Sequence, residues 1–266
     1  MRLTMLGTGS ASVTDCYNTC FVIEDNGKYF MVDGGGGNLV VSQLKKSNIS
    51  VNDIHHIFVT HKHLDHIVGV IWMIRFILQN MNTGSYEGDA YIYGHDEVIS
   101  VIDSLSHTLI RPKESDLIGK HLHLVTVEDN SVFNIINHEV TFFDINSTKT
   151  KQFGFKINID DDKYLCCLGD EPFKEPARKH VMNSEWLLHE AFCLDSQADI
   201  FNPYEKHHST VKNACETAAY LGIKNLVLYH TEDKNYSNRK KLYSEEGKKY
   251  FDGNLYIPDD LEVIEL

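Results

Sequence analysis

The most informative segment of the chain reads Ile57-Phe58-Val59-Thr60-His61-Lys62-His63-Leu64-Asp65-His66. An apolar run with the character of a strand leads directly into His-x-His-x-Asp-His, and an apolar helix is predicted over residues 65–80. Alternate residues of an extended segment project to one side, so His61, His63 and Asp65 share a face. His66 lies where the helix begins and can turn toward the same space. Imidazole and carboxylate groups bind zinc, manganese and iron at catalytic sites, so the segment predicts a metal centre.

The amino-acid composition is that of a folded, acidic protein. The 266 residues are 42% hydrophobic and 24% charged, which is typical of a globular chain and excludes a disordered one. The formal net charge of −13 disfavours broad affinity for phosphate backbones. No apolar run reaches the length of a membrane span, and the first residues lack the pattern of a signal peptide. Together with six cysteines that form no CxxC pair, these features predict a cytoplasmic protein with reduced thiols and no membrane partner.

The pattern along the chain predicts one α/β domain over residues 1–266, because no linker or low-complexity tract divides it. Runs rich in β-branched and aromatic residues predict strands at 19–24, 28–32, 54–59, 90–93, 122–127, 140–145, 153–159, 164–168 and 226–229. Besides the helix at 65–80, helices are predicted at 210–221 and, as a charged surface helix with a solvated Arg239-Lys240-Lys241 face, at 237–250. The order of these elements suggests two related halves, packed sheet on sheet with helices outside.

The His-x-His-x-Asp-His segment resembles the signature of the metallo-β-lactamase superfamily. Further motifs, in the order of that family, resemble its ribonuclease Z and phosphodiesterase branch: Leu6-Gly7-Thr8-Gly9-Ser10-Ala11, Met31-Val32-Asp33-Gly34-Gly35-Gly36, Leu168-Gly169-Asp170, Leu188-His189-Glu190-Ala191, His207-His208-Ser209-Thr210 and Leu228-Tyr229-His230. Phe192 follows Ala191 where that branch usually has Thr. The resemblance implies a single domain with the αβ/βα sandwich of this superfamily, in which two mixed β-sheets are flanked by helices.

The resemblance also implies a set of site residues. His61 and His63 would bind one divalent metal; Asp65, His66 and His230 would bind a second, with Asp170 bridging the two. Zinc is the first candidate, and manganese or iron are the alternatives. Glu190 and His208 would form the pair that protonates the leaving oxygen, and Asp65 would orient the nucleophile.

One motif departs from the family pattern. The third motif of the family carries a metal-binding His ahead of a Gly-aromatic pair, and the aligned residue in this chain is Asn146. Asn146 could bind a harder metal through its oxygen, or His138 or His208 could replace the missing ligand. The first site could instead be weak or empty, leaving a single metal at Asp65, His66, Asp170 and His230. An engineered change at Asn146 is a fourth reading, and the weakened first site is the favoured one.

The predicted function follows from these motifs and from one missing segment. Ribonuclease Z enzymes that process tRNA carry a long arm between the third motif and the Gly-Asp motif, whereas this chain has only a short hairpin between Gly154 and Gly169. We therefore expect a metal-dependent phosphodiesterase that hydrolyses small or short nucleotide phosphodiesters through a metal-bound hydroxide, with long RNA an unexpected partner.

The alternatives are a ribonuclease Z-type tRNA 3′ endonuclease, a hydrolase of esters, lactones or thioesters, and a metal-poor binding protein without activity. A homodimer is expected because related enzymes often form one.

Overall fold

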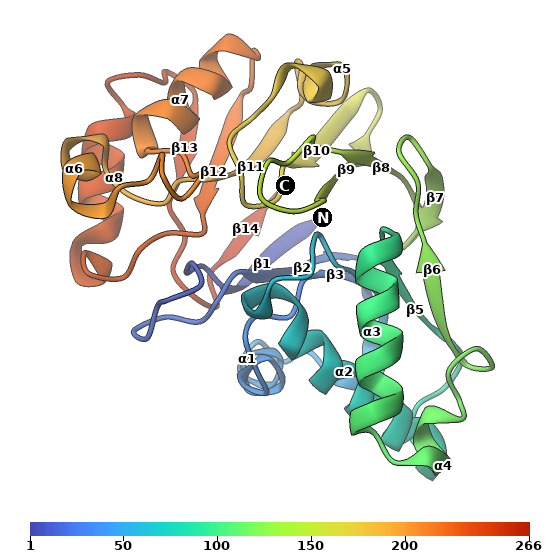
Figure 1. Ribbon diagram of the computed structural model, residues 1–266. Coiled ribbons are helices and arrows are strands. Elements are labelled where there is room, and N and C mark those ends of the chain that lie inside the picture. Colours follow the sequence, from blue (N-terminus) through green and yellow to red (C-terminus); the bar gives the residue numbers. More distant parts are fainter. The chain divides into compact units, whose positions relative to one another are not determined.

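The computed structural model describes residues 1–266, and the chain divides into two compact units. Unit 1 comprises Met1–Gly7, Tyr17–Val127 and Asp260–Leu266, and unit 2 comprises Thr8–Cys16 and Glu128–Asp259. Each unit contains one seven-stranded mixed sheet with helices beside it, which confirms the prediction of two mixed sheets flanked by helices (Figure 1). The single domain over residues 1–266 stays a prediction.

The sheet of unit 1 has the strand order β14-β1-β2-β3-β4-β5-β6. Its strands are β1 (Arg2–Gly7), β2 (Cys20–Asp25), β3 (Lys28–Val32), β4 (Ile54–Phe58), β5 (Ala90–Gly94), β6 (Leu122–Thr126) and β14 (Val263–Glu265). Its helices are α1 (Leu39–Lys46), α2 (Leu64–Thr83), α3 (Asp96–Leu109) and α4 (Pro112–Ser115). The strands from β3 to β6 are parallel, and parallel neighbours need crossover connections. α1, α2 and α3 supply these connections, and Figure 1 shows them on one face of the sheet.

The sheet of unit 2 has the strand order β13-β12-β11-β10-β9-β8-β7. Its strands are β7 (Val132–Ile135), β8 (His138–Asp144), β9 (Phe153–Asp160), β10 (Lys163–Cys167), β11 (Trp186–Glu190), β12 (Asn225–Tyr229) and β13 (Asn254–Tyr256). Its helices are α5 (Arg178–Val181), α6 (Ala198–Phe201), α7 (Val211–Tyr220) and α8 (Arg239–Gly247). The strands from β10 to β13 are parallel, while β7, β8 and β9 form antiparallel hairpins with their neighbours.

The ligand-type residues lie beyond the carboxyl ends of parallel strands. In unit 1, Asp33 follows β3 and His61 follows the neighbouring β4. In unit 2, Asp170 follows β10, Glu190 ends β11 and His230 follows β12. Because parallel strands end at the same edge of a sheet, each unit gathers its polar residues at one edge, where α/β proteins commonly place their sites.

The last predicted helix differs from expectation in one respect. The sequence predicts a charged surface helix at 237–250, and α8 occupies Arg239–Gly247 after a short 3-10 turn. Arg239 is fully buried, not solvated, because its guanidinium donates hydrogen bonds to Thr231 Oγ1 (2.7 Å), the Pro258 carbonyl (2.8 Å) and Asp259 Oδ1 (3.2 Å). A buried charge is tolerated where hydrogen bonds replace its hydration. None of the helices in the structure combines the length and hydropathy that a membrane span requires.

Two glycines let α2 approach the turn that follows β3. The Gly34 amide donates to the His66 carbonyl (2.9 Å), and the Gly69 amide donates to the Gly35 carbonyl (2.8 Å). A Cβ atom added to Gly69 would lie 1.7 Å from the Gly34 carbonyl oxygen. Glycine is therefore required at position 69, and the close approach fixes the first turns of α2, which carry Asp65 and His66.

Substituting Gly69→Ala is expected to lower the free energy of unfolding by more than about 2 kcal/mol, because the backbone clash outweighs the gain of about 1 kcal/mol in helix propensity. Urea denaturation of the two proteins measures the difference. Gly37→Ala is the matched control, since its added Cβ would meet nothing within 4 Å. Equal stability of the Gly69→Ala variant and the unmodified chain would contradict the close packing.

Candidate functional site

The carboxylate of Asp33 organises the ligand-type residues of unit 1. Its Oδ1 accepts from the Thr60 amide (2.8 Å), and its Oδ2 accepts from the Thr60 hydroxyl (2.8 Å) and from His66 Nδ1 (2.8 Å). Asp33 is buried and has a positive φ of 57°, a conformation held by the bond from its amide to the Phe58 carbonyl (2.8 Å). Hydrogen bonds of this kind orient the imidazoles of metal sites.

The same contacts determine the tautomer of His61. The Thr60 hydroxyl has one proton, which it donates to Asp33, so it accepts from His61 Nδ1 at 3.0 Å. His61 Nε2 then carries the lone pair of the ring, and it lies 2.9 Å from His63 Nδ1. Two ring nitrogens that could bind a metal therefore lie side by side at the start of α2.

The imidazole of His66 lies between two carboxylates, those of Asp33 and Asp65. His66 Nε2 lies 3.3 Å from Asp65 Oδ2, while His66 Nδ1 contacts Asp33. Burial by itself lowers the pKa of His66, but the carboxylates of Asp65 and Asp33 outweigh it and raise the pKa well above its ordinary value. The surplus of negative charge favours a cation at His66, and a divalent metal is a cation that would compete with the proton.

Unit 2 contains a second cluster, formed by Asp170, His208 and His230. Each offers one ligand atom, and these atoms lie within 4.8 Å of one another at buried positions. His230 follows β12 with a positive φ of 57°, and the next residue, Thr231, donates its amide to the Thr8 carbonyl (3.1 Å). Thr8, which belongs to the same unit, thus supports the turn that carries His230.

Glu190 and His208, the expected proton-transfer pair, face each other within unit 2. His208 Nδ1 lies 3.5 Å from Glu190 Oε2, and the other oxygen of Glu190 accepts from the Ser209 amide. Phe192 stacks on the His208 ring with centroids 5.1 Å apart and the planes inclined by 20°. A carboxylate behind Nδ1 and an aromatic ring against the imidazole face orient His208 Nε2 toward the Asp170 cluster.

Asp170 is held by two residues from the loop between β8 and β9. Gln152 Nε2 donates to Asp170 Oδ1 (2.5 Å), and Lys149 Nζ lies 3.5 Å from Asp170 Oδ2. The same ammonium lies 3.5 Å from His208 Nε2. The loop therefore fixes the carboxylate of the Gly-Asp motif and brings a cation beside it.

Asn146, the residue aligned with the missing histidine, lies elsewhere in this loop. It is exposed with a φ of 58°, and its side-chain amide donates to the Asp144 carbonyl (3.2 Å). His138 begins β8, at the opposite end of that seven-residue strand from the loop, roughly 20 Å away at the rise of an extended strand. Of the two proposed substitutes for the missing ligand, His208 is the one that lies beside Asp170 and His230.

The sequence motifs include Asp33 without assigning it a role, and they do not indicate the contacts that Thr60, Gln152 and Lys149 make. The signal for Asp33 was present, since a carboxylate that ends a strand before a glycine turn is a typical site residue. Nothing local marks the other three, because their importance comes from partners elsewhere in the chain.

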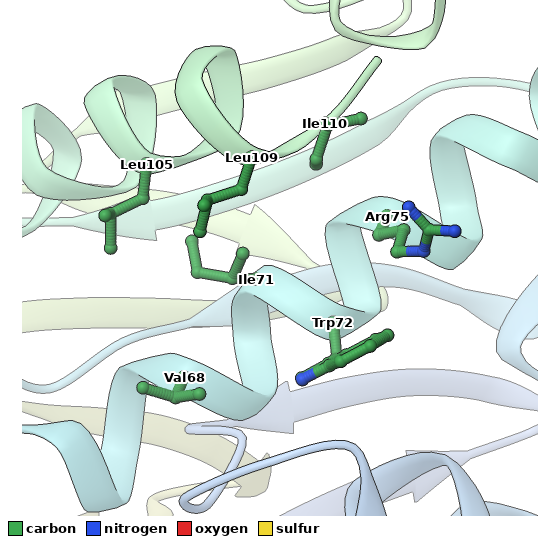
Figure 2. Close-up of a pocket in the computed structure, with 7 residues that line it drawn as sticks. All are labelled: Val68, Ile71, Trp72, Arg75, Leu105, Leu109 and Ile110. Atoms are coloured by element: carbon green, nitrogen blue, oxygen red, sulfur yellow. The ribbon is translucent and has the colours of Figure 1, made fainter.

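The apolar pocket of unit 1 is separate from these ligand-type residues. It lies between α2 and α3 and encloses about 280 Å³ (Figure 2). The lining consists of Val68, Ile71, Trp72, Arg75, Leu105, Leu109 and Ile110. The Arg75 guanidinium lies 6.0 Å from the Trp72 ring centroid. With no carboxylate, imidazole or thiol in its lining, the pocket offers no group for metal binding or proton transfer.

Glu171 holds the β8–β9 loop in place. Its carboxylate is fully buried and accepts from Ser147 Oγ (2.6 Å), the Thr148 amide (3.0 Å), the Lys149 amide (3.0 Å) and Lys174 Nζ (2.8 Å). Burial raises its pKa, but the hydrogen bonds from Lys174, Ser147 and the loop amides outweigh burial and lower it from 4.5 to about 2. The folded state therefore favours the ionised carboxylate.

A carboxyl group whose pKa is lowered by folding stabilises the protein above its unfolded pKa, and this contribution is lost as the pH falls through the folded value. Glu171→Gln is expected to reduce the free energy of unfolding by about 2 kcal/mol at pH 7. The difference in the free energy of unfolding between this variant and the unmodified chain should shrink as the pH falls from 4.5 to about 2. Urea denaturation across this range tests it, with Glu245→Gln as the control at an exposed carboxylate. A difference that does not change with pH would refute this role.

Known proteins resemble this chain over its whole length. Ribonuclease Z from Prochlorococcus marinus (strain AS9601) is 24% identical over 328 aligned positions, covering 100% of both chains. The metallo-β-lactamase fold protein YhfI from Bacillus subtilis superposes with a TM-score of 0.81 at 17% identity, covering 100% of this chain and 99% of that one. The short form of human tRNase Z superposes with a TM-score of 0.75 at 23% identity, covering 100% of this chain and 99% of that one. The predicted metallo-β-lactamase fold is thus confirmed.

The motifs and these relatives identify a metal-dependent hydrolase that is ribonuclease Z-like. A sequence profile described as Anti-Pycsar protein Apyc1 matches residues 1–250, which is nearly the entire chain. The match includes every ligand-type residue described above. The chain therefore belongs to the Anti-Pycsar protein Apyc1 family.

Proposed function

We propose that the chain is a phosphodiesterase that hydrolyses small or short nucleotide phosphodiesters. The observation that supports this most is the cluster of Asp170, His208 and His230, with Glu190 behind His208. The candidate metal ligands Asp170 and His230 there lie within 4.8 Å of His208, the candidate proton donor. Cleavage of a phosphodiester needs both, because negative charge develops on the phosphoryl oxygens while the leaving oxygen must be protonated.

The proposed metal ligands are those that the motifs predict: His61, His63, Asp65, His66, Asp170 and His230. Their imidazoles and carboxylates suit zinc first, and manganese or iron as alternatives. Bound divalent ions would neutralise phosphate charge and lower the pKa of a coordinated water. We propose two ions, with the first site weakened, because Asn146 bonds within its own turn and the Lys149 ammonium already stands beside Asp170.

In this proposal His208 donates the proton to the leaving oxygen through Nε2. Glu190 faces Nδ1 at 3.5 Å and stabilises the protonated ring, and Phe192 keeps the ring in its plane. Asp65 orients the attacking water. The separation of Glu190 and His208 is longer than a hydrogen bond, as is common for catalytic pairs before substrate binds.

A small substrate is favoured over tRNA by the connection between the third motif and the Gly-Asp motif. β9 and β10 form a hairpin with a tight turn at Asp160–Lys163, which leaves no arm in this segment. The alignment with the Prochlorococcus ribonuclease Z spans 328 positions against 266 residues here, so that protein carries segments that this chain lacks. The net charge of −13 also opposes a long RNA.

Ribonuclease Z-type cleavage of tRNA remains the alternative, supported by the relatives of that name. Hydrolysis of an ester, lactone or thioester is chemically open to the same residues, and a metal-poor binding protein is the least favoured reading. A cytoplasmic location and a homodimer complete the proposal; the first is supported by six cysteines without a CxxC pair.

His63→Ala and Asp170→Ala are expected to reduce hydrolysis of bis(p-nitrophenyl) phosphate and of dinucleotides by at least about 100-fold, because each removes a proposed metal ligand. Removing metal with a chelator should abolish the activity, and added zinc should restore it. His107→Ala, at an imidazole that is 51% exposed, and Asp161→Ala, in the exposed β9–β10 turn, are the controls. The proposal fails if both ligand variants retain full activity, or if precursor tRNA is the better substrate.

Metal content per chain is expected to be about one tightly held ion, with a second that is lost on dialysis. Asn146→His should leave the retained content near one, because residue 146 is exposed and faces its own turn, whereas Lys149 is the side chain of this loop that lies beside Asp170. Elemental analysis of both proteins, purified without chelator, measures this. Two tightly held ions in the unmodified chain would contradict the weakened first site.

A further inference from the structure

Lys149 lies in the loop between β8 and β9, the segment in which the resemblance to the family predicts a metal-binding histidine. No histidine occurs in this chain between His138 and His180, and the aligned residue Asn146 bonds within its own turn. The side chain of this loop that reaches the Asp170 cluster is instead the ammonium of Lys149, which is 17% exposed. The segment thus supplies a fixed cation in place of an imidazole.

The position of Lys149 is determined by contacts on both sides of it. Glu171 accepts from the Lys149 amide and from the Ser147 hydroxyl, so the backbone of the loop is fixed. Gln152, three residues later, is fully buried and donates to Asp170. The Lys149 side chain therefore extends from a rigid loop, and little conformational entropy is lost when its ammonium binds a ligand.

The contacts of the ammonium leave it able to bind a ligand. Lys149 Nζ lies 3.5 Å from Asp170 Oδ2 and 3.5 Å from His208 Nε2, whereas a tight ammonium–carboxylate bond is about 2.7–2.9 Å long. An ammonium has three donors, so at least one is available to an incoming anion. A phosphate group that contacts both Lys149 Nζ and His208 Nε2 would place its leaving oxygen beside the proposed proton donor, His208.

We propose that Lys149 is a catalytic residue that binds a non-bridging oxygen of the scissile phosphate and favours phosphodiesters over neutral carboxylic esters. This inference rests on the proposed function, because it names the feature of the substrate that the site recognises. The positive charge stabilises the phosphoryl oxygens as His208 protonates the leaving oxygen. A neutral ester lacks this anionic oxygen and gains far less from the ammonium.

The test compares Lys149→Gln and Lys149→Arg with the unmodified chain, with Lys151→Gln as the control that removes the same charge two residues along the loop. Isothermal titration calorimetry with inorganic phosphate measures anion binding by the zinc-loaded proteins, and elemental analysis of the same samples measures metal content. Values of kcat and KM are determined for bis(p-nitrophenyl) phosphate and p-nitrophenyl acetate. Thermal denaturation verifies that each variant folds.

Lys149→Gln is expected to weaken phosphate binding about tenfold and to lower kcat/KM for the phosphodiester about 10- to 100-fold, at unchanged metal content. For the acetate ester, kcat/KM should fall less than about threefold in Lys149→Gln. Lys149→Arg should recover most of the phosphate binding because it restores the charge. If Lys149→Gln does not fold, Lys149→Arg decides by itself, since retained phosphate binding and phosphodiester selectivity support the proposal and their loss opposes it.

Phosphate binding that is unchanged in Lys149→Gln would show Lys149 to be an internal counter-ion of Asp170 and would overturn the proposal. The same conclusion follows if phosphate binding falls together with metal content, or if Lys151→Gln has an equal effect. Failure of the proposed function is distinguishable, because phosphate binding can depend on Lys149 even in a chain that does not hydrolyse phosphodiesters.

Discussion

The buried carboxylate of Asp33 is the group on which the ligand-type residues of unit 1 depend. It contacts His66 directly and His61 through the Thr60 hydroxyl, so one charged group fixes the orientation of two imidazoles. Burying this charge is costly unless it is compensated, and three hydrogen bonds compensate it here. The left-handed backbone of Asp33 is a further cost, which is offset by its bond to Phe58. The two imidazoles are thus oriented by the protein itself.

In unit 2 the buried carboxylate of Glu171 likewise orients other side chains through hydrogen bonds. Glu171 fixes the β8–β9 loop, and that loop fixes Asp170 through Gln152 and presents Lys149 beside His208. A buried carboxylate with several donors is again what positions a reactive group. The side chain that this loop brings to Asp170 and His208 is therefore the ammonium of Lys149.

Much of the fold was predictable because buried strands and amphipathic helices leave periodic patterns. β3 agrees with its prediction at both ends, and α2 extends its predicted range by one residue and three residues. β11 (Trp186–Glu190) lies outside the predicted strands because its apolar run has only three residues and ends in the polar pair His189-Glu190, which the fold buries. β14 (Val263–Glu265) has three residues and exists through its pairing with β1, from the opposite end of the chain. Arg239 was misjudged because its partners are distant in sequence.

The sequence names the candidate metal ligands and their order along the chain, because the chemistry of imidazole and carboxylate resides in the side chain. It also determined that these residues follow strands, since apolar runs precede them. Tertiary structure alone decided that Asn146 faces its own turn while Lys149 reaches Asp170 and His208. The orientation of a loop depends on partners such as Glu171, 22 residues beyond Lys149, and no local pattern encodes contacts at that separation.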